Sequence, residues 1–294
     1  MSIVDIPVED AGALQAGRTE VRRELLGELR HSKTFLVGST ILLIWIICAI
    51  FGSAIAPHSP YTQNLLGINK APSSAHLFGT DQLGRDMFSR VIVGSRDILV
   101  IAPLATLLGT VCGTAIGLVM GYFRGVVDDV LGRFVEAFLA LPLVVTGVIA
   151  LSALGRSNLV IIIVIGLVFT PLIARTVRSA VLLERELDYV SAARLRGEGS
   201  LYIMFVEILP NVSGPILVEF TVRLAYAIFT ILTLTFLGLG VQPPSPDWGL
   251  DIATNYGVVP AGYWWEVLFD AIAIATLVVS VSLISDAVQG VLER

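Results

Sequence analysis

The sequence predicts an all-α membrane protein with six transmembrane helices, on three observations. Of its 294 residues, 55% are hydrophobic and only 15% are charged, whereas a soluble domain carries about 25% charged residues. The missing charges leave long apolar stretches, each close to the about 20 residues that a helix needs to cross a bilayer. Lys and Arg are concentrated on one side of the predicted spans, as the positive-inside rule requires.

Five charge-free stretches and a shorter sixth define the predicted helices. They cover residues 34–57, 98–123, 137–155, 157–174, 224–246 and, as the shorter one, 271–285. The last must extend past Asp270 or Asp286 to cross a bilayer. We expect transmembrane helices at about residues 35–56, 96–121, 130–153, 159–182, 214–237 and 266–289.

Residues 1–34 are interpreted as a polar N-terminal segment and residues 35–294 as one six-helix membrane domain. The excess of Lys and Arg places both termini of this multi-pass protein in the cytoplasm. Although Ala54-Ile55-Ala56 resembles a signal-peptide cleavage site, the apolar segment is long enough to remain as an anchor. The net charge of −5 gives no indication of a nucleic-acid partner.

Three connections are long. Residues 57–95 and 238–265 lie outside the membrane in this orientation, and residues 183–213 lie inside. The second outside connection contains Gln242-Pro243-Pro244-Ser245-Pro246. This cluster cannot be helical, because each proline lacks an N–H donor and restricts the residue before it.

A glycine stripe runs along the second predicted helix, at Gly109, Gly113, Gly117 and Gly121. Glycines four residues apart leave a bare face that another helix backbone can approach closely. We expect this face to pack within the membrane domain. The alternative is contact with a partner subunit or a moving gate.

The inside connection predicts a short amphipathic helix. Leu183, Leu187 and Val190 share one helical face, with charged residues between them. The small residues Ser191-Ala192-Ala193 leave space for another protein to seat against the helix, and Gly197 can end it with a positive φ. These residues alone favour a helix on the membrane surface over a docking site.

The same residues resemble the EAA loop of ABC importer permeases, which has the pattern Glu-Ala-Ala, three residues, Gly, nine residues, Ile, one residue, Leu-Pro. The matching residues are Ala192, Ala193, Gly197, Leu209 and Pro210, while Ser191 replaces the glutamate and Glu207 the isoleucine. Pro210 also sets where the backbone turns toward the fifth helix. The resemblance implies that a separate ATPase couples to this loop, on residues that include Leu187, Tyr189 and Val190.

Three further segments resemble the C-type permease subunit of dipeptide and oligopeptide ABC transporters, over about residues 80–290. They are FGTDQLGRDMFSR at 78–90, GYF at 121–123 with Asp128 and Arg133 after it, and TFLGLGVQPP at 235–244 with Pro246 and Trp248-Gly249 after it. The resemblance implies a type I importer fold with a cytoplasmic coupling helix, in a bacterial plasma (inner) membrane. It implies transport by alternating access.

The partners that this resemblance implies are a homologous B-type permease, ABC ATPase subunits, an extracytoplasmic peptide-binding protein and the lipid bilayer. ATP and Mg²⁺ would be bound by the ATPase subunits, and this chain would bind no cofactor. The implied cargo is dipeptides or oligopeptides. Nickel chelates or other small solutes are the alternative, because permeases for nickel chelates carry similar signatures.

The outside signature contributes six candidate residues, which are Gly79, Thr80, Asp81, Gly84, Arg85 and Asp86. They lie in the connection before the second helix. Asp81 and Arg85 are four residues apart and can pair if the segment is helical. We interpret the signature as a structural segment whose internal contacts fix the loop. The alternative is docking of an external binding protein.

Charges inside predicted helices are costly and are therefore functional candidates. Glu219 and Arg223 are four residues apart, and Glu136 follows Arg133 by three, so we expect structural pairing in both cases rather than contact with substrate. Glu266 and Asp270 are expected near the outer surface.

No catalytic or metal-binding set is evident. The sequence has no Gly-x-x-x-x-Gly-Lys-Ser/Thr phosphate loop, and its two cysteines cannot form a disulfide framework or metal set. His31, His58 and His76 are expected to be isolated. A proton-driven transporter would need more deeply placed acidic residues than Glu136 and Glu219, and a channel would need a filter motif.

Overall fold

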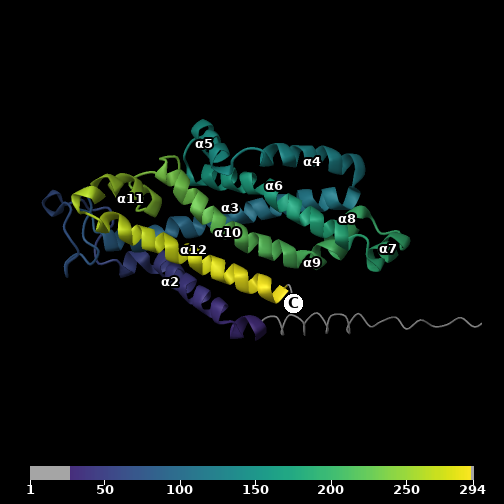
Figure 1. Cartoon of the computed structure of the whole chain (residues 1–294), viewed down its shortest axis with the longest axis horizontal. Coiled ribbons are helices and arrows are strands. Elements are labelled where there is room, and N and C mark those ends of the chain that lie inside the picture. The colour runs from purple at the N-terminus through teal and green to yellow at the C-terminus, as the bar shows by residue number, and fades with distance from the viewer. Residues whose placement is uncertain (1–26, 293–294) are drawn as a thin grey trace, which may run out of the picture.

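The computed structural model describes residues 27–292, so most of the predicted N-terminal segment lies outside the described residues. Five long apolar helices run along the molecule (Figure 1): α2 (Lys33–Ile55), α3 (Met87–Phe123), α6 (Asn158–Glu184), α10 (Ser213–Phe236) and α12 (Trp265–Leu292). A bent pair, α4 (Gly125–Leu139) and α5 (Leu143–Leu154), supplies the sixth candidate span. The predicted all-α class is confirmed.

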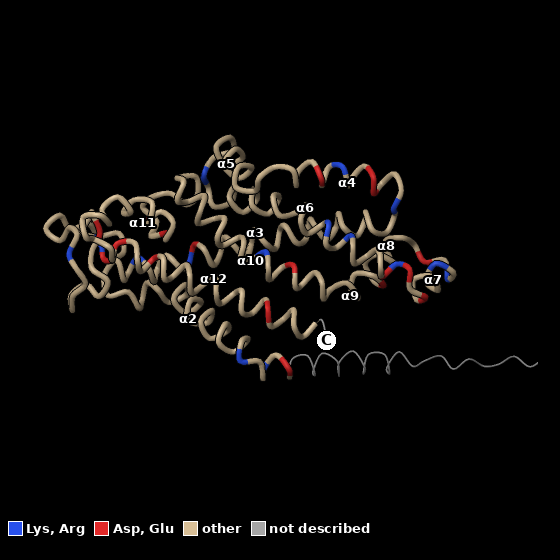
Figure 2. The backbone as a smooth tube through the Cα atoms, viewed as in Figure 1, with Lys and Arg blue, Asp and Glu red and all other residues tan. Residues whose placement is uncertain are grey.

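Shorter helices mark the two ends of the bundle. One end carries α7 (Asp188–Leu195), α8 (Ser200–Tyr202), the π-helical η2 (Ile203–Ile208) and α9 (Leu209–Asn211). The opposite end carries η1 (Leu65–Gly67), α11 (Trp248–Asn255) and η3 (Tyr256–Ala261). We call these the α7 end and the α11 end (Figure 1). Figure 2 shows charged residues gathered at both ends and along α4.

The core forms around α3 and α6, with α10 against both and with α2 against α3 and α12. Ile98, Ile165, Phe169 and Ile231 are among its fully buried side chains. Polar residues fix where several helices begin, because their side chains accept hydrogen bonds from otherwise unpaired backbone N–H groups. These N-caps are Ser32 for α2, Asp86 for α3, Ser157 for α6 and Asp247 for α11.

The glycine stripe of α3 packs against α6 of the same chain, as expected. A Cβ placed on Gly109 would lie 2.8 Å from the carbonyl oxygen of Gly166, and one on Gly117 would lie 2.7 Å from that of Ala174. These distances are shorter than side-chain carbons tolerate. The stripe therefore brings the two helix backbones together, and it faces α6 rather than a partner subunit.

Replacing Gly117 by alanine is expected to lower the free energy of unfolding by about 1–3 kcal/mol, because the added methyl group overpacks the α3–α6 contact. Thermal unfolding of the purified chain measures the change. Gly132→Ala on α4 is the matched control, since its Cβ would meet only the end of Met120, at 3.7 Å. Equal melting temperatures for the two variants would contradict the close approach.

The second helix begins earlier than predicted, at Met87 rather than near residue 96. The side-chain oxygen of Asp86 accepts from Ser89 N at 2.9 Å and starts the helix there. Charge-free length gave the wrong start because three charged residues, Arg90, Arg96 and Asp97, lie within α3. Arg90 is fully buried against the protein. The other helix ends agree with the predicted ones within a few residues.

The third predicted helix, residues 130–153, is wrong as a single element. α4 and α5 meet at an angle of 88°. Pro142 is the N-cap of α5. It lacks an N–H donor and disfavours a helical conformation at Leu141, so the helix ends before it.

The connection at residues 183–213 is more helical than predicted. α6 continues to Glu184, so Leu183 belongs to α6 and not to the amphipathic helix, which is α7 alone. Pro210 lies within the helical run of residues 200–211, and the break before α10 falls at Val212. In the connection at residues 238–265, residues 242–246 are non-helical as predicted, and α11 follows directly.

Candidate functional site

The helix α7 ends as its sequence predicts. Gly197 has a φ of 80°. Its N–H donates to the Arg194 carbonyl at 3.0 Å, and the Glu198 N–H donates to the Ala193 carbonyl at 3.2 Å. This pair of bonds is the Schellman motif, which satisfies the last carbonyls of a helix and turns the chain sharply.

One face of α7 is anchored to the bundle. Val190 and Ala193 are fully buried and belong to the main hydrophobic core. The Tyr189 hydroxyl donates to Glu184 Oε1 at 2.8 Å, and burial is the largest cause that raises the Tyr189 pKa to about 12. The Arg194 guanidinium lies 5.5 Å from the centre of the Tyr122 ring. These contacts join α7 to the ends of α6 and α3.

The opposite face of α7 is exposed. Leu187 is 48% exposed and Leu195 is 90% exposed. Ser191 and Ala192 lie exposed between them, and Leu187, Ser191 and Leu195 share one stripe because they are spaced by four residues. We call Leu187, Ser191, Ala192 and Leu195 the α7 face. The predicted loop residues are thus divided, with Val190 and Ala193 supporting the helix. Leu195 was not among the predicted site residues, although its spacing from Ser191 marks it.

The two departures from the EAA pattern have different surroundings. Glu207, in η2, receives a hydrogen bond from Arg196 at 2.9 Å, and this ion pair joins η2 to the end of α7. Ser191 is exposed on the α7 face. Leu209 packs partly buried against the core, while Pro210 is exposed.

At the α11 end, the six signature residues Gly79, Thr80, Asp81, Gly84, Arg85 and Asp86 are all buried. Asp81 accepts hydrogen bonds from the backbone N–H groups of Leu83 and Arg85, and it pairs with Arg85 Nε at 2.6 Å. The pair therefore forms in a turn rather than in a helix. A Cβ on Gly84 would lie 2.0 Å from the Asn64 carbonyl oxygen. These bonds fit the interpretation that the signature fixes the loop. Docking of an external protein stays a prediction.

Sequence reasoning missed a buried ion pair beside this signature. Arg90 and Asp251 are both inaccessible to solvent. Arg90 Nε donates to Asp251 Oδ2 at 2.8 Å, and the guanidinium also donates to the carbonyls of Pro60 and Ser245. One side chain therefore joins the end of α2, the start of α3, the proline-rich segment and α11. Arg90 lies within the recognised signature, but nothing in the sequence pointed to Asp251 as its partner.

Other carboxylates surround this pair. Glu266 and Asp270 lie near the start of α12, at this end of the bundle, and both are fully buried; their position near the outer membrane surface stays a prediction. None of their carboxylate oxygens has a hydrogen-bond partner within the described residues. Asp247 is also buried, and burial is the largest cause that raises its pKa to about 7.

The expectation that all three histidines are isolated was also wrong. His58 and His76 lie with their ring centres 4.9 Å apart, and both are close to the Asp86 carboxylate. The two histidines come from separate parts of a long connection, so their sequence positions gave no sign of the contact. His31 lies apart and bonds to the Gly27 carbonyl.

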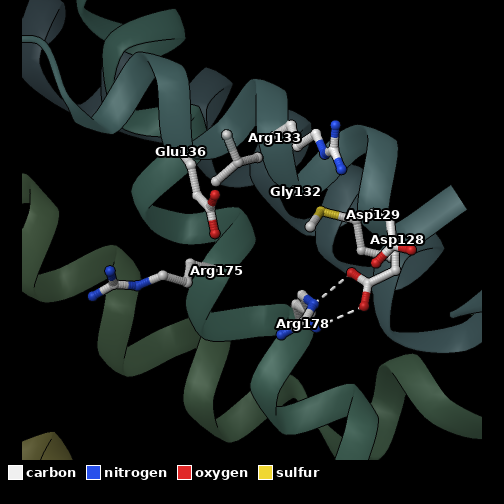
Figure 3. Close-up of a pocket in the computed structure, with 9 residues that line it drawn as sticks. Asp128, Asp129, Gly132, Arg133, Glu136, Arg175 and Arg178 are labelled. Carbon is white, nitrogen blue, oxygen red and sulfur yellow. Dashed lines mark hydrogen bonds and ion pairs between the residues drawn. The ribbon is translucent and has the colours of Figure 1, made fainter. Parts of the chain in front are cut away.

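Of the two ion pairs predicted inside transmembrane helices, one forms and the other does not. Arg223 Nε donates to Glu219 Oε1 at 2.7 Å, so the predicted pairing on α10 is confirmed. Glu136 and Arg133 form no ion pair within residues 27–292, and that pairing was wrong. Both line a cavity of about 420 Å³ between α4 and α6, where Arg178 pairs with Asp128 at 2.6 Å (Figure 3).

Two family models match this chain. The model described as "Binding-protein-dependent transport system inner membrane component" matches residues 113–294. The model described as "N-terminal TM domain of oligopeptide transport permease C" matches residues 22–72. Together they cover the first apolar helix and all of the chain from Gly113 onward, which includes α7 and the proline-rich segment.

Curated relatives are similar over nearly the whole chain. The di/tripeptide transport system permease protein DppC of Pseudomonas aeruginosa is 34% identical over 277 residues, which cover 92% of this chain and 91% of the relative. The dipeptide transport system permease protein DppC of Escherichia coli is 34% identical over 270 residues, which cover 90% of each.

A solved structure shares the fold. A chain of the MetNI methionine ABC transporter, in inward-facing conformations, aligns with a TM-score of 0.58 at 18% identity. The alignment covers 71% of this chain and 98% of the other. The predicted type I importer fold is therefore confirmed.

Proposed function

The chain belongs to the family of binding-protein-dependent transport system inner membrane components, and we propose that it is a transmembrane permease subunit of an ATP-driven importer of dipeptides or oligopeptides. The observation that carries this proposal is the 34% identity to a di/tripeptide permease over 92% of the chain. As a permease subunit of an ABC importer, it is a transport protein and not an enzyme.

The α7 face is the proposed contact with an ATPase subunit. It joins exposed apolar side chains, above all Leu195, to a helix whose other side is fixed in the core by Val190 and Ala193. A partner that pushes on α7 can therefore tilt the long helices as rigid bodies. ATP and Mg²⁺ are proposed to bind the ATPase subunits.

This coupling sets the orientation that we propose. The α7 end lies in the cytoplasm, and the α11 end faces the external binding protein in a bacterial plasma membrane. The beginning of α2 and the end of α12 are then cytoplasmic, which agrees with the excess of Lys and Arg on that side. A homologous B-type permease completes the pathway, and alternating access carries the cargo across.

Peptide is favoured over nickel chelate as the cargo, because the named relatives are di/tripeptide and dipeptide permeases. The test is reconstitution of this chain in vesicles with its second permease, ATPases and binding protein, followed by uptake of labelled dipeptide and of chelated nickel. We expect dipeptide uptake that requires both ATP and the binding protein. Uptake of the nickel chelate alone would refute the peptide assignment, and uptake without ATP would refute the importer.

A further inference from the structure

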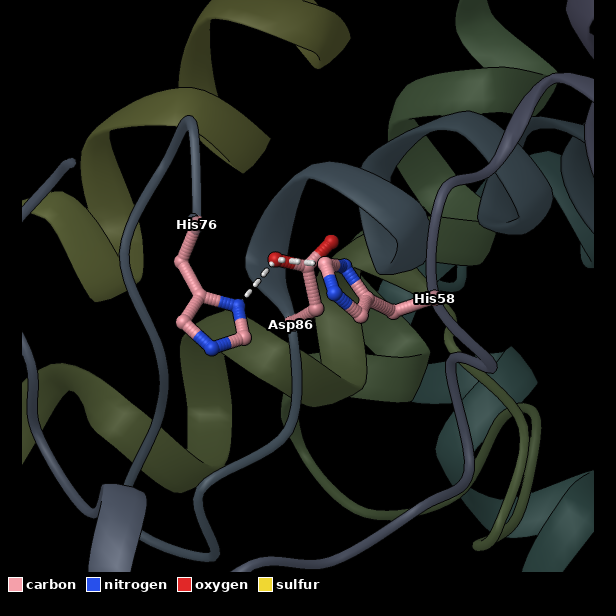
Figure 4. Close-up of side chains that lie close together, drawn as sticks. All are labelled: His58, His76 and Asp86. Carbon is pink, nitrogen blue, oxygen red and sulfur yellow. Dashed lines mark hydrogen bonds and ion pairs between the residues drawn. The ribbon is translucent and has the colours of Figure 1, made fainter. Parts of the chain in front are cut away.

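Two imidazoles and a carboxylate converge at the α11 end (Figure 4). His58 follows the end of α2, His76 lies in the connection before α3, and Asp86 is the N-cap of α3. Asp86 Oδ1 lies 2.8 Å from His76 Nδ1 and 3.8 Å from His58 Nδ1. One oxygen and two nitrogens that can bind a metal ion thus lie within 4.8 Å of one another.

Hydrogen bonds from Ser89 fix the orientation of the Asp86 carboxylate. Its other oxygen, Oδ2, accepts hydrogen bonds from the backbone N–H of Ser89 at 2.9 Å and from the Ser89 hydroxyl at 2.6 Å. The His58 backbone N–H in turn donates to the Ser89 hydroxyl at 3.2 Å. Oδ1 is therefore the oxygen left to face the histidines. Carboxylates that bind metals are held in the same way by an outer layer of hydrogen bonds.

The Asp86 carboxylate is held by hydrogen bonds but not, among the described residues, by a Lys or Arg side chain. Its side chain is only 2% exposed, and a nearby cation stabilises a buried carboxylate beyond what hydrogen bonds supply. No Lys or Arg lies within ion-pair distance of it among residues 27–292. The neighbouring guanidinium groups are directed elsewhere, Arg85 to Asp81 and Arg90 to Asp251. Imidazole nitrogens of His76 and His58 face the buried oxygen, at 2.8 Å and 3.8 Å.

We propose that His58, His76 and Asp86 form a binding site for a divalent transition-metal ion with the ligand preference of Zn²⁺. Imidazole nitrogen and carboxylate oxygen bind Zn²⁺ at about 2.0–2.2 Å, which places the ligand atoms of a tetrahedral site roughly 3.3–3.5 Å apart. The observed 2.8 Å and 3.8 Å lie on either side of that spacing, and all three ligand atoms lie within 4.8 Å of one another. Relative shifts of no more than about 1.5 Å therefore complete the geometry. Because the His58 side chain is 46% exposed, water can fill the fourth position.

The ion would hold together three segments that are separate in the sequence. It would link the residues after α2, the connection and the first turn of α3. Without a metal ion, the same groups can form an ordinary hydrogen-bonded cluster in which the imidazole N–H groups donate to Asp86. The two arrangements differ in a measurable way, because only the first is stabilised by added metal.

The test is a titration of the full chain with ZnCl₂, after purification from membranes with its accompanying subunits and removal of metal by a chelator. Calorimetry should show a site with a Kd at or below roughly 10 µM, and Zn²⁺ should raise the melting temperature. The double variant His58→Ala, His76→Ala should lose this site, with affinity at least about a hundredfold weaker. His31→Ala, which removes a histidine outside the cluster, should bind as the unaltered chain does.

The comparison between variants assigns the site to this chain even if an accompanying subunit also binds Zn²⁺. His58→Ala alone provides a second test if the double variant fails to fold, because its exposed ring makes the longer of the two contacts. The proposal would be overturned if the double variant or His58→Ala bound Zn²⁺ with the same affinity as the unaltered chain. Absence of both a binding isotherm and a rise in melting temperature for the unaltered chain would overturn it as well.

Discussion

Replacing Arg90 by methionine is expected to lower the free energy of unfolding by about 3–5 kcal/mol, the usual cost of breaking a buried ion pair from one side. Methionine fills much of the space of the arginine stem but leaves Asp251 as a buried charge without a partner. It also removes the donors to the carbonyls of Pro60 and Ser245. Thermal or denaturant unfolding of the purified chain measures the loss.

Replacing the other partner of the ion pair, Asp251, by asparagine should lower the free energy of unfolding by less. In Asp251→Asn, Arg90 keeps its two carbonyl acceptors, and the asparagine amide oxygen can still accept a hydrogen bond from the guanidinium. The variant with both substitutions should be more stable than Arg90→Met alone, because it carries one unpaired charge fewer. This order follows because Arg90 keeps hydrogen-bond acceptors when Asp251 is replaced, whereas the Asp251 side chain loses its partner when Arg90 is replaced.

Arg196→Met serves as the control for these variants. Arg196 also forms an ion pair, with Glu207, but its side chain is 54% exposed, so its loss should cost less than about 1 kcal/mol. If Arg90→Met unfolds at the same temperature as Arg196→Met, the buried pair does not stabilise the α11 end. If Asp251→Asn is the more damaging variant, the two carbonyl acceptors do not stabilise Arg90 in the absence of its carboxylate partner.

The positions of the long helices could be predicted because they depend on local composition. An apolar stretch of sufficient length becomes a helix in a bilayer, where every backbone polar group must be bonded within the segment. α2 and α10 accordingly begin and end close to the predicted residues. The prediction failed where charge-free length and helix length differ, as at Arg90, which lies in α3 although it is charged.

The sequence contained a signal for the break between α4 and α5, since Pro142 lies inside an otherwise apolar segment. Prolines are nevertheless tolerated within other helices of this chain, at Pro103 in α3 and Pro171 in α6. A proline alone therefore does not decide between a kink, a break and a continuous helix. The packing of the surrounding helices makes that decision.

The charge clusters could not be predicted, because they depend on long-range contacts. Arg90 and Asp251 are 161 residues apart in the sequence, and His58 meets Asp86 only through the fold of the connection between them. By contrast, Asp81 with Arg85 and Glu219 with Arg223 are each four residues apart, and both pairs form. Sequence spacing favours local ion pairs, although Arg133 and Glu136 do not form one within the described residues, and it gives no information about distant pairs.

The loop resemblance identified α7 correctly as an element, but it could not separate the two faces of the helix. Ala193 matches the family pattern, yet it is fully buried in this chain's own core. A bulky residue at Ala193 would therefore disturb the seating of α7 and could not report on a partner. A clean test of coupling needs a residue whose side chain makes little contact within the chain.

Leu195→Glu is such a test, and we expect it to abolish ATP-driven transport by separating the ATPase from α7. Leu195 is 90% exposed, so the substitution should leave the melting temperature of the chain nearly unchanged. In the assembled transporter it would place a charge in an apolar contact, at a cost of about 2 kcal/mol or more, which is roughly a thirtyfold loss of affinity. Co-purification of the ATPase and peptide uptake by reconstituted vesicles measure the two effects.

Leu66→Glu is the matched control, because Leu66 is 91% exposed and lies at the α11 end. It introduces the same charge in place of the same side chain, so ATPase association should be normal in this variant and weak in Leu195→Glu. Normal ATPase association in both variants would refute the α7 face as the contact. Loss of association in both would trace the effect to a general fault in membrane assembly. Because Val190 and Ala193 fix α7 in the core, an intact α7 with a charged outer face should yield a chain that folds but is no longer driven by ATP.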